Sequence, residues 1–304
     1  MKILLFGRNG QVGWELQRSL SVLGQLVALD FEAGANPNAL CGDFSDLEGL
    51  AKTVQRVGPD VIVNAAAHTA VDKAQGEPDL ARTLNALAPG VLAAQARQLG
   101  AWLVHYSTDY VFDGSGDRPW REDDATAPLS VYGQTKLEGE MAVRHCPNHL
   151  ILRTSWVYAG RGNNFAKTML RLAAERASLS VVDDQLGAPT SAELLADVTA
   201  HALLTVLRKP ELAGLYHCAA SGQTSWHAYA RYVLDQARAL GWELQAGPEQ
   251  VTAVTTAQYP SVAVRPLNSR LDTNRLQHTF GLTLPHWQVH VRRMLEEIPR
   301  PLPR

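Results

Sequence analysis

The sequence has few cysteines and no long apolar run, and both absences limit the kind of protein it encodes. Its three cysteines, Cys41, Cys146 and Cys218, are scattered and odd in number, which is typical of reduced thiols in a cytosol. No apolar stretch reaches the roughly eighteen residues that a membrane-spanning helix needs. The first apolar run ends after four residues at Gly7 and is too short for the core of a signal peptide. These absences predict a cytoplasmic protein without a membrane partner.

An excess of charge of one sign is also missing. The chain carries 28 Lys and Arg against 30 Asp and Glu, for a net charge of −2. Without a basic stripe or interleaved basic and aromatic residues, we expect no nucleic-acid partner. The 304 residues, 46% of them hydrophobic, are enough to bury about three quarters of the unfolded surface. The sequence therefore predicts a large folded domain with a smaller companion.

Apolar runs alternate with helical patterns along most of the chain. We expect strands at 3–6, 26–29, 60–66, 102–107, 150–153 and 215–218, and helices at 12–23, 46–57, 78–99, 131–145 and 191–207. Such alternation predicts an α/β fold, a doubly wound, mainly parallel, Rossmann-like sheet with a smaller C-terminal substrate-binding region. We assign residues 1–156 plus about 191–219 to a dinucleotide-binding domain, and about 157–190 plus 220–304 to the substrate-binding domain.

A glycine-rich turn follows the first predicted strand and opens the first predicted helix. Gly7, Gly10 and Gly13 lie three residues apart, and glycine permits both a tight turn and a close approach of phosphate to the backbone. The following helix N-terminus offers unpaired N–H groups to an anion. Asp30 ends the second strand, where a carboxylate accepts hydrogen bonds from a ribose. The pattern predicts a dinucleotide site, and the alternative is a turn without a ligand.

Tyr132 and Lys136 are four residues apart on a predicted helix for which Ser130 is a candidate N-cap. This spacing puts both side chains on one helical face. A neighbouring ammonium lowers the pKa of a phenol, so we expect Lys136 to prepare Tyr132 for proton exchange with a carbinol oxygen. The alternative is a solvated helix face. The hydroxyls of Ser107 and Thr108 end a strand further upstream and are candidates to bind the same oxygen.

Glycine turn, strand-end hydroxyl and Tyr-x-x-x-Lys, in this order, resemble the extended short-chain dehydrogenases/reductases. The resemblance implies that Thr108, with Ser107 as the alternative, acts with Tyr132 and Lys136 in catalysis. It also implies that Lys136 holds the nicotinamide ribose.

Longer strings extend the resemblance over nearly the whole chain. Residues 6–17, 64–73, 105–112, 153–160, 163–167 and 184–190 are similar to the family of dTDP-4-dehydrorhamnose reductases. This likeness implies reduction of the C4 ketone of dTDP-4-dehydro-L-rhamnose by NADPH or NADH, the last step of dTDP-L-rhamnose biosynthesis, with Tyr132 supplying the proton.

The same resemblance implies the residues that hold the ligands. For the cofactor they are Gly7, Asn9, Gly10, Gln11, Val12, Asp30, Asp43, Phe44, Ala65, Ala66, Ala67, His68, Thr69, Tyr106, Tyr132 and Lys136. For the dTDP-sugar substrate they are Thr108, Asp109, Tyr132 and Trp156. Core packing is the alternative role for Phe44 and Trp156.

Some members of this family carry a divalent cation at a dimer interface. The matching carboxylates are Glu15, Glu193 and Glu297, and such hard oxygen ligands suit Mg²⁺. We therefore expect a homodimer with magnesium, and the alternative is that these carboxylates lie on solvated helix faces.

Two kinds of rival share this fold: a nucleotide-sugar dehydratase or epimerase, and a non-catalytic regulatory subunit. A dehydratase needs a second acid after Thr108-Asp109, but Tyr110 occupies that position. A nucleotide-sugar epimerase or a non-catalytic, reductase-like regulatory subunit stays open. Asp30 disfavours a 2′-phosphate whereas Arg8 favours one, so we expect both NADH and NADPH to serve.

Overall fold

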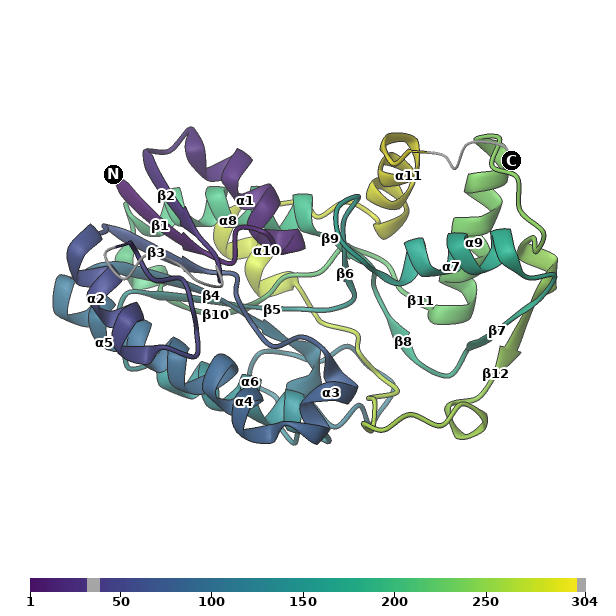
Figure 1. Ribbon diagram of the computed structural model, residues 1–304, viewed down its shortest axis with the longest axis horizontal. Helices are drawn as coiled ribbons and strands as arrows, with labels where there is room; N and C mark the ends of the chain where they lie inside the picture. The colour runs from purple at the N-terminus through teal and green to yellow at the C-terminus, as the bar shows by residue number, and fades with distance from the viewer. Residues whose placement is uncertain (32–38, 300–304) are drawn as a thin grey trace.

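The computed structural model describes residues 1–31 and 39–299; the parts of the predicted domains at 32–38 and 300–304 lie outside the described residues. Its centre is a six-stranded sheet in the order β10-β5-β4-β3-β1-β2 (Figure 1). Every neighbouring pair in it is parallel. The strands are β1 (Lys2–Phe6), β2 (Gln25–Leu29), β3 (Val61–Asn64), β4 (Trp102–Thr108), β5 (His149–Thr154) and β10 (Gly214–His217). The predicted fold class is confirmed.

Helices cover both faces of this sheet because its strands are apolar on both sides (Figure 1). Ile3 and Leu5 of β1 share one hydrophobic cluster with α1 (Gln11–Ser21) and α8 (Ala192–Val206). Leu4 and Phe6 face the opposite cluster, which α2 (Leu47–Val57), α5 (Ala88–Leu99) and α6 (Val131–Val143) complete. Alternate residues of one strand therefore anchor opposite helical layers.

A smaller part, at the right of Figure 1, is built from long helices and two-stranded pairings. Its strand pairs are β6 (Val157–Tyr158) with β9 (Thr190–Ser191), β8 (Leu186–Gly187) with β11 (Thr224–Ser225), and β7 (Leu179–Val182) with β12 (Val251–Val254). Its helices are α7 (Phe165–Glu175), α9 (Trp226–Ala239) and α11 (Trp287–Glu297), whereas α10 (Asn274–Phe280) returns to the large sheet. Short helical turns are η2 (Asp109–Val111), η3 (Pro210–Leu212), η4 (Pro248–Gln250) and η5 (Thr256–Gln258). The sequence did not indicate these strands, because runs of two residues (β6, β8, β9, β11) or four residues (β7, β12) are too short to show a clear periodic pattern.

The chain is helical throughout the predicted helix at 78–99, but a π-helical turn interrupts its α-helical pattern. The chain forms α3 (Val71–Gly76), α4 (Pro78–Arg82) and the π-helical turn η1 (Thr83–Leu87) before α5 begins. Asn85 in η1 is fully buried and bonds the backbone of His68. This interaction favours the wider turn, which side-chain periodicity does not reveal.

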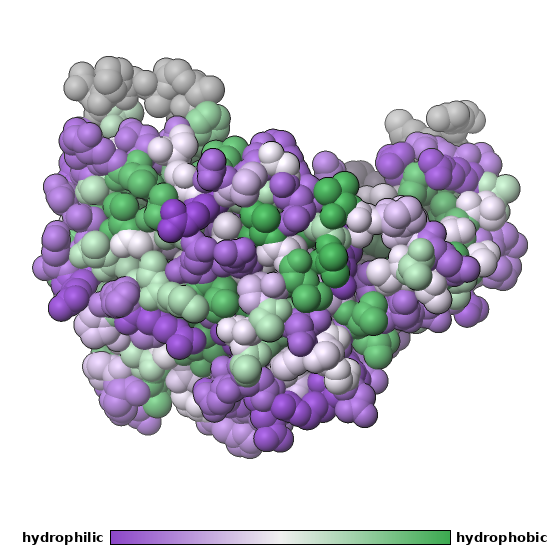
Figure 2. All heavy atoms as spheres, turned by 90° about the horizontal axis from the view of Figure 1, so that it is seen from below, coloured by the Kyte–Doolittle hydropathy of each residue, from purple (hydrophilic) through white to green (hydrophobic). Residues whose placement is uncertain are grey.

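The surface seen from below Figure 1 mixes hydrophilic and hydrophobic residues in small patches (Figure 2). Within the described parts of the chain, no helix combines the length and the apolar character needed to cross a membrane.

The start of α6 is fixed by the side chain of its N-cap residue. Ser130 caps α6, as predicted, by accepting the Gly133 amide at 3.2 Å.

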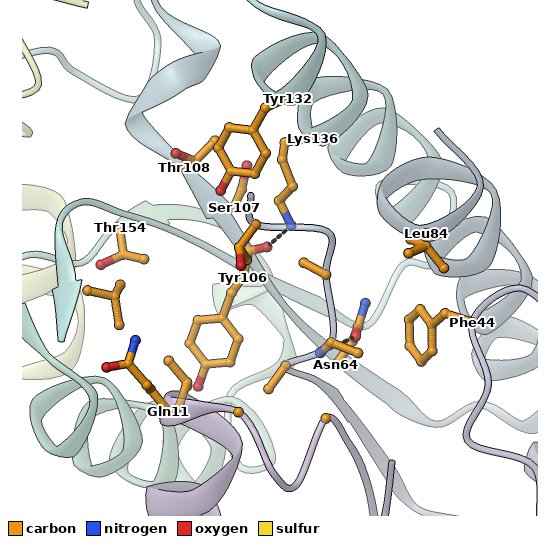
Figure 3. A pocket seen from close by; sticks show the side chains of 18 of the residues that line it. Gln11, Phe44, Asn64, Leu84, Tyr106, Ser107, Thr108, Tyr132, Lys136 and Thr154 are labelled. Carbon is orange, nitrogen blue, oxygen red and sulfur yellow. Dashed lines mark hydrogen bonds between the residues drawn. The ribbon is translucent and has the colours of Figure 1, made fainter. Parts of the chain in front are cut away.

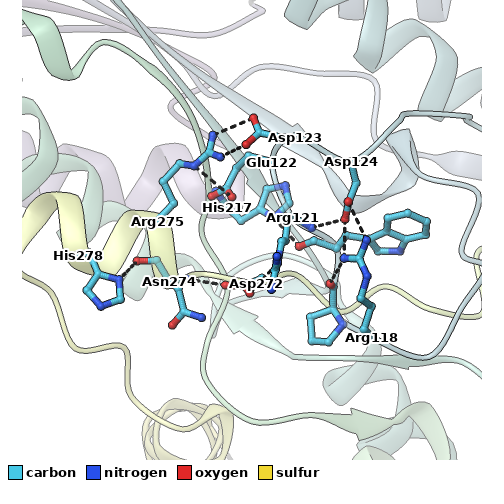
Figure 4. Close-up of polar contacts among 12 residues, drawn as sticks. Arg118, Arg121, Glu122, Asp123, Asp124, His217, Asp272, Asn274, Arg275 and His278 are labelled. Carbon is cyan, nitrogen blue, oxygen red and sulfur yellow. Dashed lines mark hydrogen bonds and ion pairs between the residues drawn. The ribbon is translucent and has the colours of Figure 1, made fainter.

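Ion pairs fasten the segment around residues 118–124 to β10 and α10 (Figure 4). Glu122 accepts the backbone amide of His217 at 3.0 Å and lies 3.6 Å from the guanidinium of Arg275. Arg118 donates two 2.8 Å hydrogen bonds to Asp124.

A buried ion pair joins the sheet to a covering helix. Arg153 of β5 donates two hydrogen bonds to Glu140 of α6, at 2.7 and 2.8 Å. Both residues are at most 1% exposed.

This buried pair leads to a stability prediction. Glu140→Ala leaves the guanidinium of Arg153 buried without its anion, so we expect the free energy of unfolding to fall by about 3–5 kcal/mol. Glu138→Ala on the same helix removes only a solvent-exposed pair with Arg82 and is expected to cost about 0–1 kcal/mol. Urea unfolding of the two variants checks this, and equal losses would contradict it.

Candidate active site

A cleft of about 830 Å³ lies at the carboxyl ends of β1–β5. This edge is where ligands bind in open parallel sheets. Its lining comes from the glycine turn, the ends of β2, β3, β4 and β5, the start of α6, and α9. Figure 3 shows the side chains of Tyr132, Thr108 and Lys136 close together, Lys136 reaching toward Tyr106, and Gln11 and Phe44 further away on opposite sides of the view.

The glycine turn is held by contacts that exclude larger residues. Gly7 has a φ of +84°, and a Cβ there would lie 2.7 Å from the carbonyl carbon of Ala65. A Cβ on Gly13 would lie 1.9 Å from the Gly7 carbonyl oxygen. Gly10, the N-cap of α1, has no side-chain cap, and a Cβ there would meet only Gly7 O at 3.4 Å. The turn therefore leaves helix N–H groups open toward the cleft, which fits a pyrophosphate.

Asp30 lines the cleft beside this turn, and backbone amides fix its carboxylate. The amide of Asn9 donates to Oδ2 at 2.7 Å, and that of Phe31 donates to Oδ1 at 2.8 Å. Asn9 itself is not among the lining residues, so its position suits orienting Asp30 rather than lining the cleft. Arg8 donates to the carbonyl oxygen of Ala28 at 3.3 Å.

Asp43 and Phe44 line the far end of the cleft. Phe44 is only 5% exposed and meets Phe6 edge-on, with 5.5 Å between ring centroids. Core packing and cleft lining thus coexist in this residue. Asp43 Oδ1 accepts both the amide and the hydroxyl of Ser45, which fixes its carboxylate.

Lys136 is buried, with 3% exposure, and its Nζ donates to the carbonyl oxygen of Tyr106 at 2.6 Å. Burial lowers the pKa of this ammonium to about 8, while the negative charge of Glu140 opposes the shift. The Tyr106 hydroxyl bonds the Thr199 hydroxyl at 2.5 Å. The ammonium is therefore fixed to the end of β4.

Tyr132 differs from the sequence prediction in its acidity. Desolvation raises its pKa above the ordinary value, with a smaller opposing contribution from a hydrogen bond to Thr108. The expected lowering by Lys136 is wrong, because desolvation of the phenol dominates the shift and the ammonium donates to the Tyr106 carbonyl. Tyr132 consequently keeps its proton, the state that a proton donor needs.

Thr108 lies at the end of β4 between two partners. Its hydroxyl donates to Asp109 Oδ1 at 3.1 Å and accepts the Tyr110 amide at 3.2 Å. Burial raises the pKa of Asp109 to about 7, and hydrogen bonds from Ser269 and Thr108 oppose the shift. The ring of Tyr110 meets that of Tyr132 edge-on at 5.4 Å. Ser107, the alternative hydroxyl, also lines the cleft.

Two buried asparagines missed in the sequence shape the wall at residues 64–69. Asn64 accepts the amide of Ala66 at 3.0 Å. Asn85 accepts the His68 amide at 2.8 Å and donates to the His68 carbonyl and the Thr135 hydroxyl, both at 3.1 Å. The sequence could have indicated Asn64, because it is a polar residue at the end of an apolar strand. Nothing in the sequence indicated the role of Asn85, because its hydrogen-bond partners are distant along the chain.

The predicted cofactor-binding residues at 65–69 divide into two groups. Ala65, Ala66, Ala67 and Thr69 line the cleft, as do Gln11 and Val12 at the start of α1. His68 does not, because it is 8% exposed and its Nε2 lies 2.6 Å from Glu77 Oε1. Its backbone, rather than its ring, shapes the wall.

The three predicted magnesium ligands lie on α1, α8 and α11. Arg293 lies 3.6 Å from Glu193 and 3.0 Å from Glu297, while Arg18 lies 3.4 Å from Glu15. Among residues 1–31 and 39–299, no group of three His, Cys, Asp or Glu side chains is arranged to hold a metal ion. Guanidinium groups thus neutralise these carboxylates, and they do not fit a magnesium site within one chain.

The glycine contacts give two contrasting predictions. Gly13→Ala drives a Cβ into the Gly7 backbone, so we expect a destabilised protein with a lower thermal midpoint. Gly10→Ala has room to fold but adds a methyl group at the helix N-terminus, so its midpoint stays near the wild-type value while NADPH binds at least tenfold more weakly. Thermal unfolding and NADPH titration test the pair, and unimpaired NADPH binding by Gly10→Ala would contradict the assignment.

Comparisons with known proteins agree with this geometry. The family model described as the RmlD substrate binding domain matches residues 1–299. The dTDP-4-dehydrorhamnose reductases of Salmonella typhimurium and Escherichia coli K12 are 60% and 58% identical over 299 residues, covering 98% of this chain and of each relative. A solved dTDP-4-dehydrorhamnose reductase from Clostridium acetobutylicum superposes with a TM-score of 0.85 at 36% identity, covering 97% of this chain and 99% of that one. A second, from Bacillus anthracis in complex with NADP, gives a TM-score of 0.84 at 33% identity with the same coverage. The chain therefore belongs to the RmlD substrate binding domain family.

Proposed function

We propose that the protein acts as a dTDP-4-dehydrorhamnose reductase, which reduces the C4 ketone of dTDP-4-dehydro-L-rhamnose to give dTDP-L-rhamnose. The observation that carries the proposal is that a single cleft holds both the glycine turn with Asp30 and the group Thr108, Tyr132 and Lys136. One end suits a dinucleotide and the other suits proton transfer to a carbonyl oxygen. The similarity to named reductases at 58–60% identity supports the substrate.

NADPH or NADH, when bound, supplies the hydride. Around it, the open N-terminus of α1 would bind the pyrophosphate and Asp30 the adenosine ribose. Lys136, fixed on the Tyr106 carbonyl, would bind the ribose next to the nicotinamide. The wall at residues 65–69 would keep the nicotinamide facing the substrate.

Tyr132 holds the proton at its phenol oxygen and delivers it to the substrate C4 oxygen as negative charge develops there. Thr108 binds the same oxygen and orients the ketone. Asp109, beside Thr108, and Trp156 would contact the sugar. Holding the reacting groups together in one desolvated cleft supplies the larger part of the rate acceleration.

We also propose a homodimer and a cytoplasmic location. The three cysteines are free thiols in the described structure, as a reducing compartment requires. Magnesium at Glu15, Glu193 and Glu297 would require a second chain to supply ligands and the arginines to move away.

The deciding experiment is incubation of the protein with dTDP-4-dehydro-L-rhamnose and NADPH. Reduction consumes one NADPH per sugar and gives dTDP-L-rhamnose, whereas an epimerase returns its cofactor and a regulatory subunit leaves the sugar unchanged. Absorbance loss and identification of the sugar product separate these three functions. A well-folded protein that consumed no NADPH would contradict the proposal.

Replacement of the proton donor tests the chemistry. Tyr132→Phe removes the hydroxyl but keeps the ring against Tyr110, so we expect kcat to fall by about 10²–10⁴-fold. The dissociation constant for NADPH should stay within about twofold. Steady-state kinetics and fluorescence titration measure both, and normal turnover by the variant would contradict the role of Tyr132.

The lowered pKa of Lys136 predicts a pH dependence. Because burial places that pKa at about 8, the ammonium is charged below this pH and becomes neutral above it. We expect kcat/KM for NADPH to fall as the pH rises through about 8, since this ratio reports groups of the free enzyme. The residual activity of Tyr132→Phe should show the same decline. A flat profile up to pH 10 would contradict it.

A further inference from the structure

We propose that Trp226 and Gly187 hold the indole of Trp156 in one fixed orientation, so that Trp156 and Trp226 together form the sugar-facing wall of the cleft. Trp226 is then a positioning residue for substrate binding, a role that the sequence did not indicate. The inference rests on the proposed function, because it concerns the site for the sugar.

The backbone of Trp156 shows why its side chain needs support. Its φ is +50°, and it is the one non-glycine residue with a positive φ in the described chain. Residues other than glycine rarely adopt a positive φ, and this backbone strain persists only when surrounding contacts impose it. The carbonyl oxygen of Trp156 accepts the amide of Thr190 at 3.2 Å, and the next residue, Val157, pairs with Thr190. These contacts fix the backbone but not the indole.

Trp226 fixes one face of that indole. The two ring centroids lie 3.6 Å apart with an interplanar angle of 14°, a stacked arrangement. Trp226 is the first residue of α9, and Phe165 packs against it at 4.5 Å. Its indole is therefore anchored in the smaller part of the molecule.

Gly187 fixes the position of the same indole from β8. A Cβ there would lie 2.6 Å from Cε2 and 2.9 Å from Nε1 of Trp156. The pairing of β8 with β11 sets Gly187 opposite Thr224, two residues before Trp226. A single short antiparallel pairing therefore places both contacts of the Trp156 ring.

Both tryptophans line the cleft together with Thr108 and Tyr132. A stacked pair offers a rigid apolar surface, and rigidity lowers the ordering cost of binding. A 6-deoxyhexose carries a methyl group and a face of C–H bonds, so it matches such a wall. The wall would thus contribute to selection of a deoxysugar over a more hydroxylated hexose.

Three variants and one control test this assignment: Trp226→Ala, Trp226→Phe, Gly187→Ala and Gly76→Ala. Gly76 is the matched control because a Cβ there meets nothing within 4 Å. Each protein is examined by circular dichroism without ligands, because stacked indoles give an exciton couplet and this is the one Trp–Trp stack among the described residues. The KM for dTDP-4-dehydro-L-rhamnose and the dissociation constant for NADPH are then measured separately.

We expect Trp226→Ala and Gly187→Ala to lose the couplet and to raise the KM for the sugar about tenfold, with NADPH binding unchanged. Trp226→Phe should keep the KM for the sugar close to the wild-type value because an aromatic face remains. Gly76→Ala should match the wild type in all measurements. The proposal is overturned if the couplet is lost while the KM stays constant, or if sugar and NADPH binding weaken together.

The design separates this inference from the proposed function. If Trp226→Ala does not fold, Gly187→Ala and Trp226→Phe still decide the outcome. If the wild type does not reduce the sugar, the proposed function fails, whereas a couplet that survives in Gly187→Ala would refute the positioning on its own.

Discussion

The buried ammonium of Lys136 sets the strictest requirement on this structure. Removing a charged amine from water is costly unless hydrogen bonds and nearby charges compensate. Here the compensation comes from the Tyr106 carbonyl at 2.6 Å and from the negative charge of Glu140 one turn along α6. Because the carbonyl belongs to β4 and the lysine to α6, this hydrogen bond also fixes the helix that carries Tyr132. The charge of Lys136, the position of α6 and the placement of Tyr132 thus all depend on this one hydrogen bond.

Desolvation then acts on neighbouring groups in opposite directions. It lowers the pKa of Lys136 to about 8 and raises that of Asp109 to about 7. It also raises the pKa of Tyr132, which keeps the phenol protonated. In reduction the phenol must give its proton away, so a neutral Tyr132 is the productive form. The hydrogen bond with Thr108 links this donor to the end of the strand.

The sequence predicted the parts of this arrangement that depend on local spacing. The glycine turn, Asp30 at the end of a strand and the pair Tyr132 and Lys136 are all recognised from residue type and local spacing. Their common location follows from the rule that parallel strands meet at their carboxyl ends. The lining of the cleft by Trp156 was expected from the family resemblance, not from its spacing.

What the sequence did not indicate depends on residues far apart in the chain. Asn85 acts through a π-helical turn on a loop 17 residues away, and Gly187 is required by the ring of Trp156. The raised pKa of Tyr132 was also missed, because spacing reveals that Lys136 is near but not that the phenol is buried. Magnesium binding stays a prediction for a dimer, since arginines occupy the carboxylates within one chain.

The most direct test of this account is ultraviolet difference titration of the wild type against Tyr132→Phe without ligands. The difference spectrum isolates one of the eight tyrosines. If desolvation controls Tyr132, no phenolate signal from it appears below about pH 10. A phenolate signal near neutral pH would show instead that the ammonium of Lys136 governs the phenol, and would contradict the account.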